Sequence, residues 1–441
     1  MNSQTLLMLF VCSCFDATIK IECCPDFCRC DRTIGEVNCA GANITQVQNV
    51  ISQMPSDSKT LILSENNIDN FTIIDKSLVF RQLKKVDFGD NKLKEFPSVL
   101  GLIFPDLQVL VLNSNDISNI SEEDFKFFNA LQVLSLQDNQ IVELPERCFS
   151  MLPNLRRLVL SGNKIQTLST STFDSISTDL VGLNLNDNAL NELPDGVFNA
   201  FTNPALKLFL NNNQLTSLPA KQMFPKLKTI AHLNLYQNQL NAIPEATFRG
   251  TMIKVFNLAS NKLSSVPSRL MFHILFLTDN PLNCSCGFSD FIIHAKDIGG
   301  NTFGSCHTST RKSLQIITKL NKNEIRREFC DECQLRNICL NGALCVAVNK
   351  TKIECRCTAN YTGQRCEKSP EDDGKSNNQI IINDNSENHA CSVIIIVICA
   401  TILLICVCII AVVCVTKKTK GRKNINVNDQ TDLPNENTYL L

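Results

Sequence analysis

Cysteine is the residue whose number and spacing first suggest chemistry in this chain. The 441 residues include 23 cysteines, and their distribution is uneven. Five lie between Cys23 and Cys39, ten lie between Cys284 and Cys366, and only Cys148 lies in the long stretch between these groups. Clustered cysteines either bind a metal such as zinc or form disulfides. The export signals described below favour disulfides made in an oxidising compartment.

The sequence contains no motif that is typical of a catalytic site. The five histidines are scattered through the chain, and no nucleophile motif, glycine-rich phosphate loop or metal-binding helix motif accompanies them. The formal net charge is -1, which argues against a broad nucleic-acid footprint. The sequence therefore predicts a chain that is not an enzyme, needs no cofactor and binds no nucleic acid.

A repeat determines which elements position these residues. Leu107, Leu131 and Leu155 each begin the frame LxxLxLxxNxL, and the whole repeat region spans residues 53–282. The repeat asparagines are Asn66, Asn91, Asn115, Asn139, Asn163, Asn188, Asn213, Asn238, Asn261 and Asn280. This period is typical of leucine-rich repeats. It predicts an α/β-type solenoid of ten repeats, with short parallel strands on its concave face.

Each part of the repeat has an expected structural role. The LxL segment is a strand with two leucines pointing inward, and the asparagine side chain bonds the backbone at the turn. Phenylalanine recurs on the convex side, with Met223 and Met271 expected at the same place in two repeats. The phenylalanines are Phe125, Phe149, Phe173, Phe198 and Phe248. One repeat cannot bury a core alone, so both ends must be sealed.

Two cysteine groups stand at the ends of the array. The segment "CPDFCRCDRTIGEVNC" in residues 24–52 and the segment "NPLNCSC" that leads into residues 283–330 resemble the caps of extracellular leucine-rich repeat proteins. Four cysteines allow three pairings, so the spacing alone chooses none. The resemblance implies the pairs Cys24–Cys30, Cys28–Cys39, Cys284–Cys306 and Cys286–Cys330. The usual tryptophan of the second cap is absent, so its core must pack differently.

A further six-cysteine group fills residues 331–367 and ends in "CRCTANYTGQRC". This pattern resembles an epidermal-growth-factor-like (EGF-like) module. The resemblance implies the pairs Cys333–Cys345, Cys339–Cys355 and Cys357–Cys366. The acidic lead of calcium-binding versions is incomplete before Cys333, so no calcium is expected. Cys148 is expected to be a buried thiol, whereas Cys23 is either free or paired between chains.

Membrane and export segments frame the chain. Residues 393–415 are apolar and uncharged, long enough to cross a bilayer of about 30 Å. Lysines and an arginine follow directly, which places the tail 416–441 in the cytoplasm. A buried helix or a glycolipid anchor fits this segment less well.

The apolar stretch within residues 1–20 predicts a signal peptide, cut between residues 14 and 22. Residues 368–391 are predicted to form an acidic stalk before the membrane segment.

Glycosylation is expected on an exported chain of this kind. The Asn-x-Ser/Thr acceptor sequence occurs six times, and Asn283, beside a cap cysteine, is the poorest candidate. The other five are Asn43, Asn70, Asn119, Asn349 and Asn360.

The order of segments resembles the vasorin-like and Slit-type leucine-rich repeat proteins. The resemblance implies a single-pass type I plasma-membrane protein, with its N-terminus outside, that binds an extracellular protein in adhesion, growth-factor or guidance-type recognition. Two alternatives stay open. One is an ectodomain shed from the stalk to act as a soluble ligand or trap. The other is an innate-immune co-receptor without its own signalling domain.

Two sets of residues are candidate binding sites. The ligand set is predicted on the concave face, where strand side chains alternate and these point away from the leucines, although ordinary surface variation explains them equally well. It comprises Phe209, His232, Asn234, Tyr236, Asn257 and Phe276. In the tail, Glu436, Leu440 and Leu441 resemble an acidic dileucine endocytic signal. Tyr439 with the same two leucines and the free carboxylate resembles a PDZ-type ligand.

Overall fold

The computed structural model describes residues 24–71, 78–307, 311–314, 319–329, 344–347, 353–357 and 365–366. The predicted signal peptide, stalk, membrane span and tail all lie outside these residues. The chain divides into two compact units, and each is described by itself. Within the described part of the chain, no helix is both long enough and apolar enough to span a bilayer.

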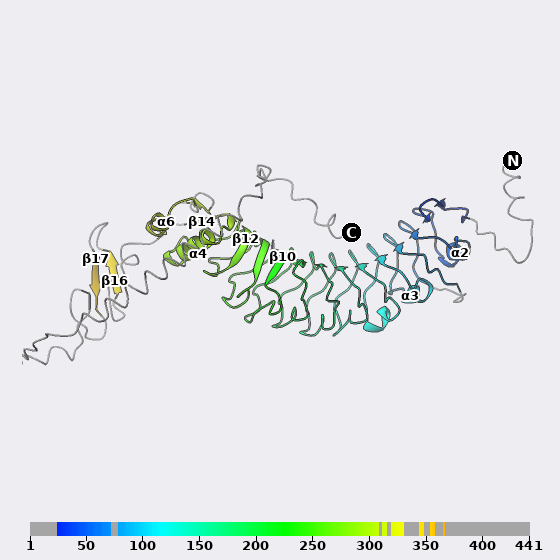
Figure 1. Cartoon of the computed structure of the whole chain (residues 1–441), viewed down its shortest axis with the longest axis horizontal. Coiled ribbons are helices and arrows are strands. Elements are labelled where there is room, and N and C mark those ends of the chain that lie inside the picture. Colours follow the sequence, from blue (N-terminus) through cyan, green and yellow to red (C-terminus); the bar gives the residue numbers. More distant parts are fainter. Residues whose placement is uncertain are drawn as a thin grey trace, which may run out of the picture. The chain divides into compact units, whose positions relative to one another are not determined.

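A sheet of 13 strands, ordered as in the sequence, runs through the first unit. Figure 1 shows the strands of the repeats along one side of the stack and the connecting turns along the other. Every neighbouring pair from β2 onward is parallel, and β1 is antiparallel to β2. The strands are β1 (Arg29–Asp31), β2 (Glu36–Asn38), β3 (Thr60–Ile62), β4 (Lys85–Asp87), β5 (Val109–Val111), β6 (Val133–Ser135), β7 (Arg157–Val159), β8 (Gly182–Asn184), β9 (Lys207–Phe209), β10 (Thr229–Asn234), β11 (Met252–Asn257), β12 (Met271–Phe276) and β13 (Asn301–Phe303).

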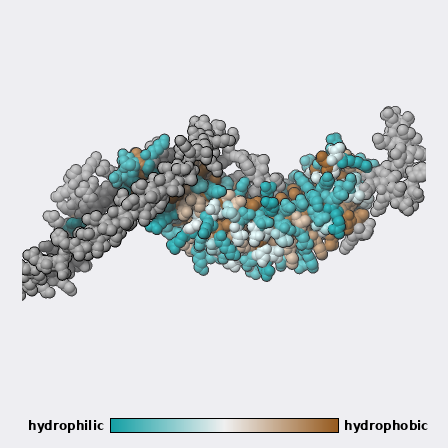
Figure 2. Space-filling model, viewed as in Figure 1, coloured by the Kyte–Doolittle hydropathy of each residue, from teal (hydrophilic) through white to brown (hydrophobic). Residues whose placement is uncertain are grey.

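Strands β3 to β12 match the ten predicted repeats, and the leucine-rich repeat solenoid is confirmed. In the repeat of β5, Leu107, Leu110 and Leu112 are all buried, and one continuous hydrophobic core joins all the repeats to both caps. Hydrophilic residues cover much of the outside of the repeats in the view of Figure 2. Each coil is thus a thin layer whose apolar interior is closed only by its neighbours.

The repeat asparagines form a buried ladder, as predicted. Asn115 Nδ2 donates to the carbonyl of Leu112 at 3.2 Å and to that of Phe88, one repeat earlier, at 3.0 Å. Its Oδ1 accepts the N–H of Leu93 at 2.9 Å. Equivalent bonds recur from Asn66 to Asn280, so each side chain ties two consecutive coils together.

The residue before each ladder asparagine lies in the left-handed region, with φ between 52° and 68°. Only one of the ten is glycine, and the others are mainly Asp, Ser and Asn, whose short polar side chains tolerate this conformation. They are Glu65, Asp90, Ser114, Asp138, Gly162, Asp187, Asn212, Gln237, Ser260 and Asp279. This residue turns the chain out of the strand.

Phenylalanine rings stack along the inside of the connecting turns. Ring centroids are 5.6 Å apart for Phe125–Phe149, 6.2 Å for Phe149–Phe173 and 6.0 Å for Phe173–Phe198. The stack continues 5.6 Å further to Phe224, although the neighbouring Met223 is also buried. Short helical turns lie in the same connections: α2 (Gln48–Ile51), α3 (Leu100–Ile103) and η1 (Glu122–Phe125).

The predicted place of Met271 is wrong. Met271 is the first residue of β12 and pairs with Met252 of β11, so it belongs to the sheet. The physical reason is the length of this repeat, because only 19 residues separate Asn261 from Asn280. With fewer residues in the turn, the chain enters the strand earlier.

Both caps are closed by disulfides. In the N-terminal cap, Cys24 is bonded to Cys30 and Cys28 to Cys39, the pairing implied by the resemblance. The C-terminal cap contains α4 (Cys286–Asp297), β14 (Ser305–His307), β15 (Arg311–Ser313) and α6 (Lys322–Phe329). Cys284 is bonded to Cys306. Cys286 is also disulfide-bonded, and its expected partner Cys330 lies outside the described residues.

Phenylalanine fills the core of the C-terminal cap in place of the missing tryptophan. Phe291 of α4 stacks on Phe272 of β12 at 6.0 Å and contacts Phe288 at 5.3 Å. The last repeat is therefore covered by aromatic rings rather than by solvent.

The cysteine-rich segment after the C-terminal cap is described in part. Strands β16 (Leu344–Ala347) and β17 (Ile353–Arg356) form a two-stranded sheet, and Cys357 is bonded to Cys366. Cys355 is also disulfide-bonded. Cys333 and Cys339, which the EGF-like pairing requires, lie outside the described residues.

Candidate functional site

The concave face is built from rows of side chains that cross the parallel strands. The central apolar residue of each repeat strand, which is usually leucine, points inward, so the residues on either side of it point outward. Strands β9 to β12 keep one register, which aligns these outward residues between repeats. One row is Lys207, His232, Val255 and Ile274, and the next is Phe209, Asn234, Asn257 and Phe276.

Phe209 is not exposed as the sequence predicted. Only 3% of its surface is accessible, and it packs against Val159, which lies two strands away in the same row. Its ring also lies 5.0 Å from that of His232. The short side chain of Asn184 between Val159 and Phe209 lets the ring lean across β8, which removes apolar surface from water. Phe209 therefore stabilises the face instead of offering a contact.

Asn234 and Asn257 accept hydrogen bonds from the backbone just after their strands end. Oδ1 of Asn234 accepts the N–H of Tyr236 at 3.0 Å, and Oδ1 of Asn257 accepts the N–H of Ala259 at 3.0 Å. Asn184 makes the same bond within its own repeat. Asn234 is also buried, so the prediction that it faces solvent is wrong. Both asparagines satisfy backbone donors that lie beyond the end of the strand.

Tyr236 and Phe276 are the predicted aromatics that remain open. Tyr236 is exposed over 37% of its surface. Phe276 is half-buried and stacks on Phe303 of the cap strand at 5.0 Å, so the apolar face continues past the last repeat. His232 is half-buried, and burial, followed by the charge of Lys207, lowers its pKa to about 4. The imidazole is therefore neutral at physiological pH.

The C-terminal repeats carry a wider surface than the sequence pattern predicts. Strands β10, β11 and β12 have six residues each, against three in β3 to β9. Their register of paired residues passes over Ala231, Lys254 and His273, one residue in each strand. The extra length adds half-buried Met252 and Met271 to Val255 and Ile274. The sequence did carry a signal for these longer strands, because the last two spacings between ladder asparagines shorten to 23 and 19 residues.

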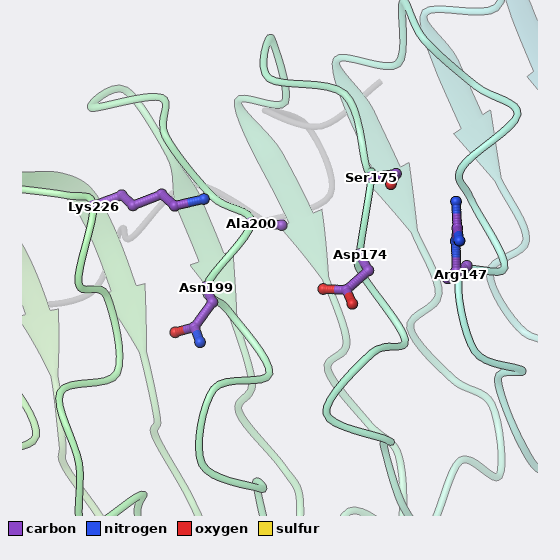
Figure 3. A pocket seen from close by; sticks show the side chains of 6 residues that line it. All are labelled: Arg147, Asp174, Ser175, Asn199, Ala200 and Lys226. Carbon is purple, nitrogen blue, oxygen red and sulfur yellow. The ribbon is translucent and has the colours of Figure 1, made fainter.

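A polar hollow of about 340 Å³ lies on the turns of the middle repeats, away from this face. Figure 3 shows the Lys226 side chain reaching into it from one end and Arg147 standing at the other, with Asp174 and Asn199 between them. Neither cation forms an ion pair with any residue that the structure describes. Its lining mixes both charge signs, which fits no single ligand class.

Cys148 is a free, buried cysteine. Burial raises the pKa of its thiol to about 12, and the nearby carboxylates of Asp124 and Glu122 add to the shift. Thiolate chemistry is therefore suppressed. Across the described residues, no three His, Cys, Asp or Glu side chains are grouped to hold a metal ion.

Three of the predicted glycosylation sites lie in the described part of the chain. Asn43, Asn70 and Asn119 are all exposed, and so is Asn283. Asn349 and Asn360 lie outside the described residues. The accessible amides leave these sites as predictions compatible with the fold.

Comparison with known proteins agrees with this architecture. The leucine-rich repeat family pattern matches residues 81–141, 105–165 and 129–178. A chain of the octameric complex of Latrophilin 3 (Lec, Olf), Unc5D (Ig, Ig2, TSP1) and FLRT2 (LRR) is 25% identical, with a TM-score of 0.50. That match covers 64% of this chain and 92% of the other. A chain of the Drosophila Toll–Spatzle complex is 23% identical over 59% of this chain and 35% of its own, with a TM-score of 0.49.

Fold, ladder and comparisons together define the class. The solenoid has the leucine-rich repeat fold, the family pattern matches residues 81–178 within it, and the chain resembles extracellular leucine-rich repeat proteins.

Proposed function

We propose that this chain is a single-pass cell-surface protein that binds an extracellular protein through the concave face of β10 to β13. The observation that carries the proposal is the open apolar surface formed by Tyr236, Val255, Ile274 and Phe276, continued by Phe303. Large aromatic and aliphatic side chains at the centre of a face are typical of binding hot spots. Half-buried methionines at its edge adapt to the shape of a partner.

Three sequence features support the cell-surface part of the proposal. They are the apolar N-terminal stretch, the uncharged segment 393–415 with its basic flank, and the cysteine pairing of both caps. The EGF-like module, glycosylation and the tail signals belong to the same proposal. In the similar complex, FLRT2 is assembled with Latrophilin 3 and Unc5D, which supports a protein as the ligand here. We also propose that the chain binds and does not catalyse.

The test compares variants of the full chain displayed on cells. Soluble extracellular proteins are screened for binding to these cells, and each hit is measured against Tyr236→Ala and Ile274→Ser. A hot-spot residue contributes about 2 kcal/mol or more, which is at least about 30-fold in affinity. Phe127→Ala is the matched control, because Phe127 is 40% exposed and lies in the turns rather than in the sheet.

Loss of binding in both concave variants, at normal surface levels and with the control unchanged, supports the proposal. Equal binding by all variants would place the ligand site elsewhere on the chain.

A further inference from the structure

The near-neutral total charge conceals two regions of opposite sign. Residues 53–204 contain twenty acidic and twelve basic side chains. Residues 205–282 contain eight lysines and arginines and only two acidic residues, Glu245 and Asp279. The last three to four repeats are therefore strongly basic, whereas the repeats before them are acidic.

Most of these cations lie on one edge of the sheet. Lys228 directly precedes β10, while Lys226, Arg249 and Arg269 lie within three residues of the starts of β10, β11 and β12. Lys254 is exposed and is the third residue of β11. Because the three strands are parallel and in register, these five residues form a row across the strand starts, here named the basic edge.

The basic edge contains no acidic residue of its own, although Lys226 also lines the polar hollow with Asp174 (Figure 3). All five side chains are exposed, and none forms an ion pair with a residue that the structure describes. Glu245 instead accepts the backbone N–H of Ser268 at 3.3 Å. Neighbouring strands are about 4.8 Å apart, so cations at adjacent strand starts are carried by backbones that lie within the screening length of about 8 Å at physiological salt.

We propose that the basic edge binds a sulfated polysaccharide, beside the concave protein-binding face with which it shares strands β10 to β12. An extended polymer with anionic groups along its length matches a row of exposed, unpositioned cations. An acidic protein is less well matched, because protein interfaces fix their charges around a shaped core, and this edge has no such core. The acidic repeats before β9 would confine the polymer to the C-terminal repeats. The choice of an extracellular polymer rests on the cell-surface location proposed above.

The experiment measures binding of the full chain, purified in detergent, to immobilised heparin at several salt concentrations. The test variant carries Lys228→Gln, Arg249→Gln, Lys254→Gln and Arg269→Gln. The control variant carries Lys92→Gln, Lys94→Gln and Lys164→Gln, three exposed lysines outside the basic edge. Circular dichroism confirms that both variants are folded.

We expect wild type and control to bind heparin with the same steep salt dependence. If each cation contributes about 0.7 to the slope of log affinity against log salt, four contacts lose about 50-fold in affinity between about 50 and 200 mM salt. The test variant should lose most of this salt-dependent binding. Equal retention of test variant and wild type would overturn the proposal. If polyglutamate binds as tightly as heparin, the proposal of a polysaccharide ligand is overturned and an acidic polypeptide takes its place. Both results are independent of the concave variants, so failure here leaves the protein-binding proposal standing.

Discussion

Replacing one asparagine of the ladder should open the fold locally, by an amount that depends on which backbone groups lose all their partners. In Asn163→Ala, the carbonyls of Leu136 and Leu160 each keep a bond from a neighbouring asparagine. The carbonyl of Ser161 keeps the N–H of Asp138. Only the buried N–H of Ile141, which now donates to Asn163 Oδ1 at 3.0 Å, is left without a partner. One orphaned buried amide costs about 1–3 kcal/mol.

Hydrogen–deuterium exchange measured by mass spectrometry tests this value. A loss of about 1–3 kcal/mol should speed exchange of the peptide containing Ile141 by about 5- to 150-fold. In Asn280→Ala, two groups are orphaned, the N–H of Leu263 and the carbonyl of Leu277, so the loss should be about twice as large. Lys164→Ala, at an exposed neighbouring site, is the control. Equal effects of Asn163→Ala and its control would refute the ladder as a source of stability.

Four further results are expected. Gly162→Ala should destabilise the chain, because φ is 68° there and the new Cβ would collide with the Asp138 carboxylate; Asp138→Ser should partly restore the urea midpoint. Cys148 should resist iodoacetamide at about pH 8 until urea unfolds the chain, since its thiol pKa is raised to about 12. The pKa of His232 is lowered to about 4 in the fold, so its contribution to stability is present above about pH 6.5 and is lost as the pH falls toward 4; His232→Gln should flatten the urea midpoint between about pH 7 and 5. A glycine added after Leu441 should abolish PDZ-type binding but leave dileucine endocytosis intact, whereas Leu440→Ala with Leu441→Ala should abolish both.

The repeat period predicted the backbone well because it reports a constraint that every coil shares. The inward leucines and the ladder asparagines occur at fixed positions in nearly every repeat, and the structure uses them as expected. The ends were predictable for a similar reason, since a solenoid needs sealed ends and cysteine clusters stood at both. Phe224, beside the expected Met223, shows the limit, because two adjacent apolar residues can fill the same space.

The candidate site was harder to predict, because the alternation of side chains along a strand shows which way each side chain points but not how far its neighbours bury it. Phe209 does point out of the sheet, yet its ring leans two strands away onto Val159. That contact depends on the small side chain of Asn184, in a different repeat. Asn234 and Asn257 likewise appeared free because their bonds are to backbone two residues onward. Position in one strand could not reveal either arrangement.

The charge pattern connects binding with stability in this fold. Coils contact only their nearest neighbours, and salt screens charges beyond about 8 Å, so the acidic repeats before β9 cannot offset repulsion along the basic edge around Lys228, Lys254 and Arg269. We expect this repulsion to weaken the last repeats, which pack against the aromatic cap around Phe291. A bound polyanion would remove that repulsion and stabilise these repeats by linkage. The protein-binding face and the basic edge share strands β10 to β12. A bound polymer that rigidifies these strands would therefore also favour the conformation of the concave face that binds a protein partner.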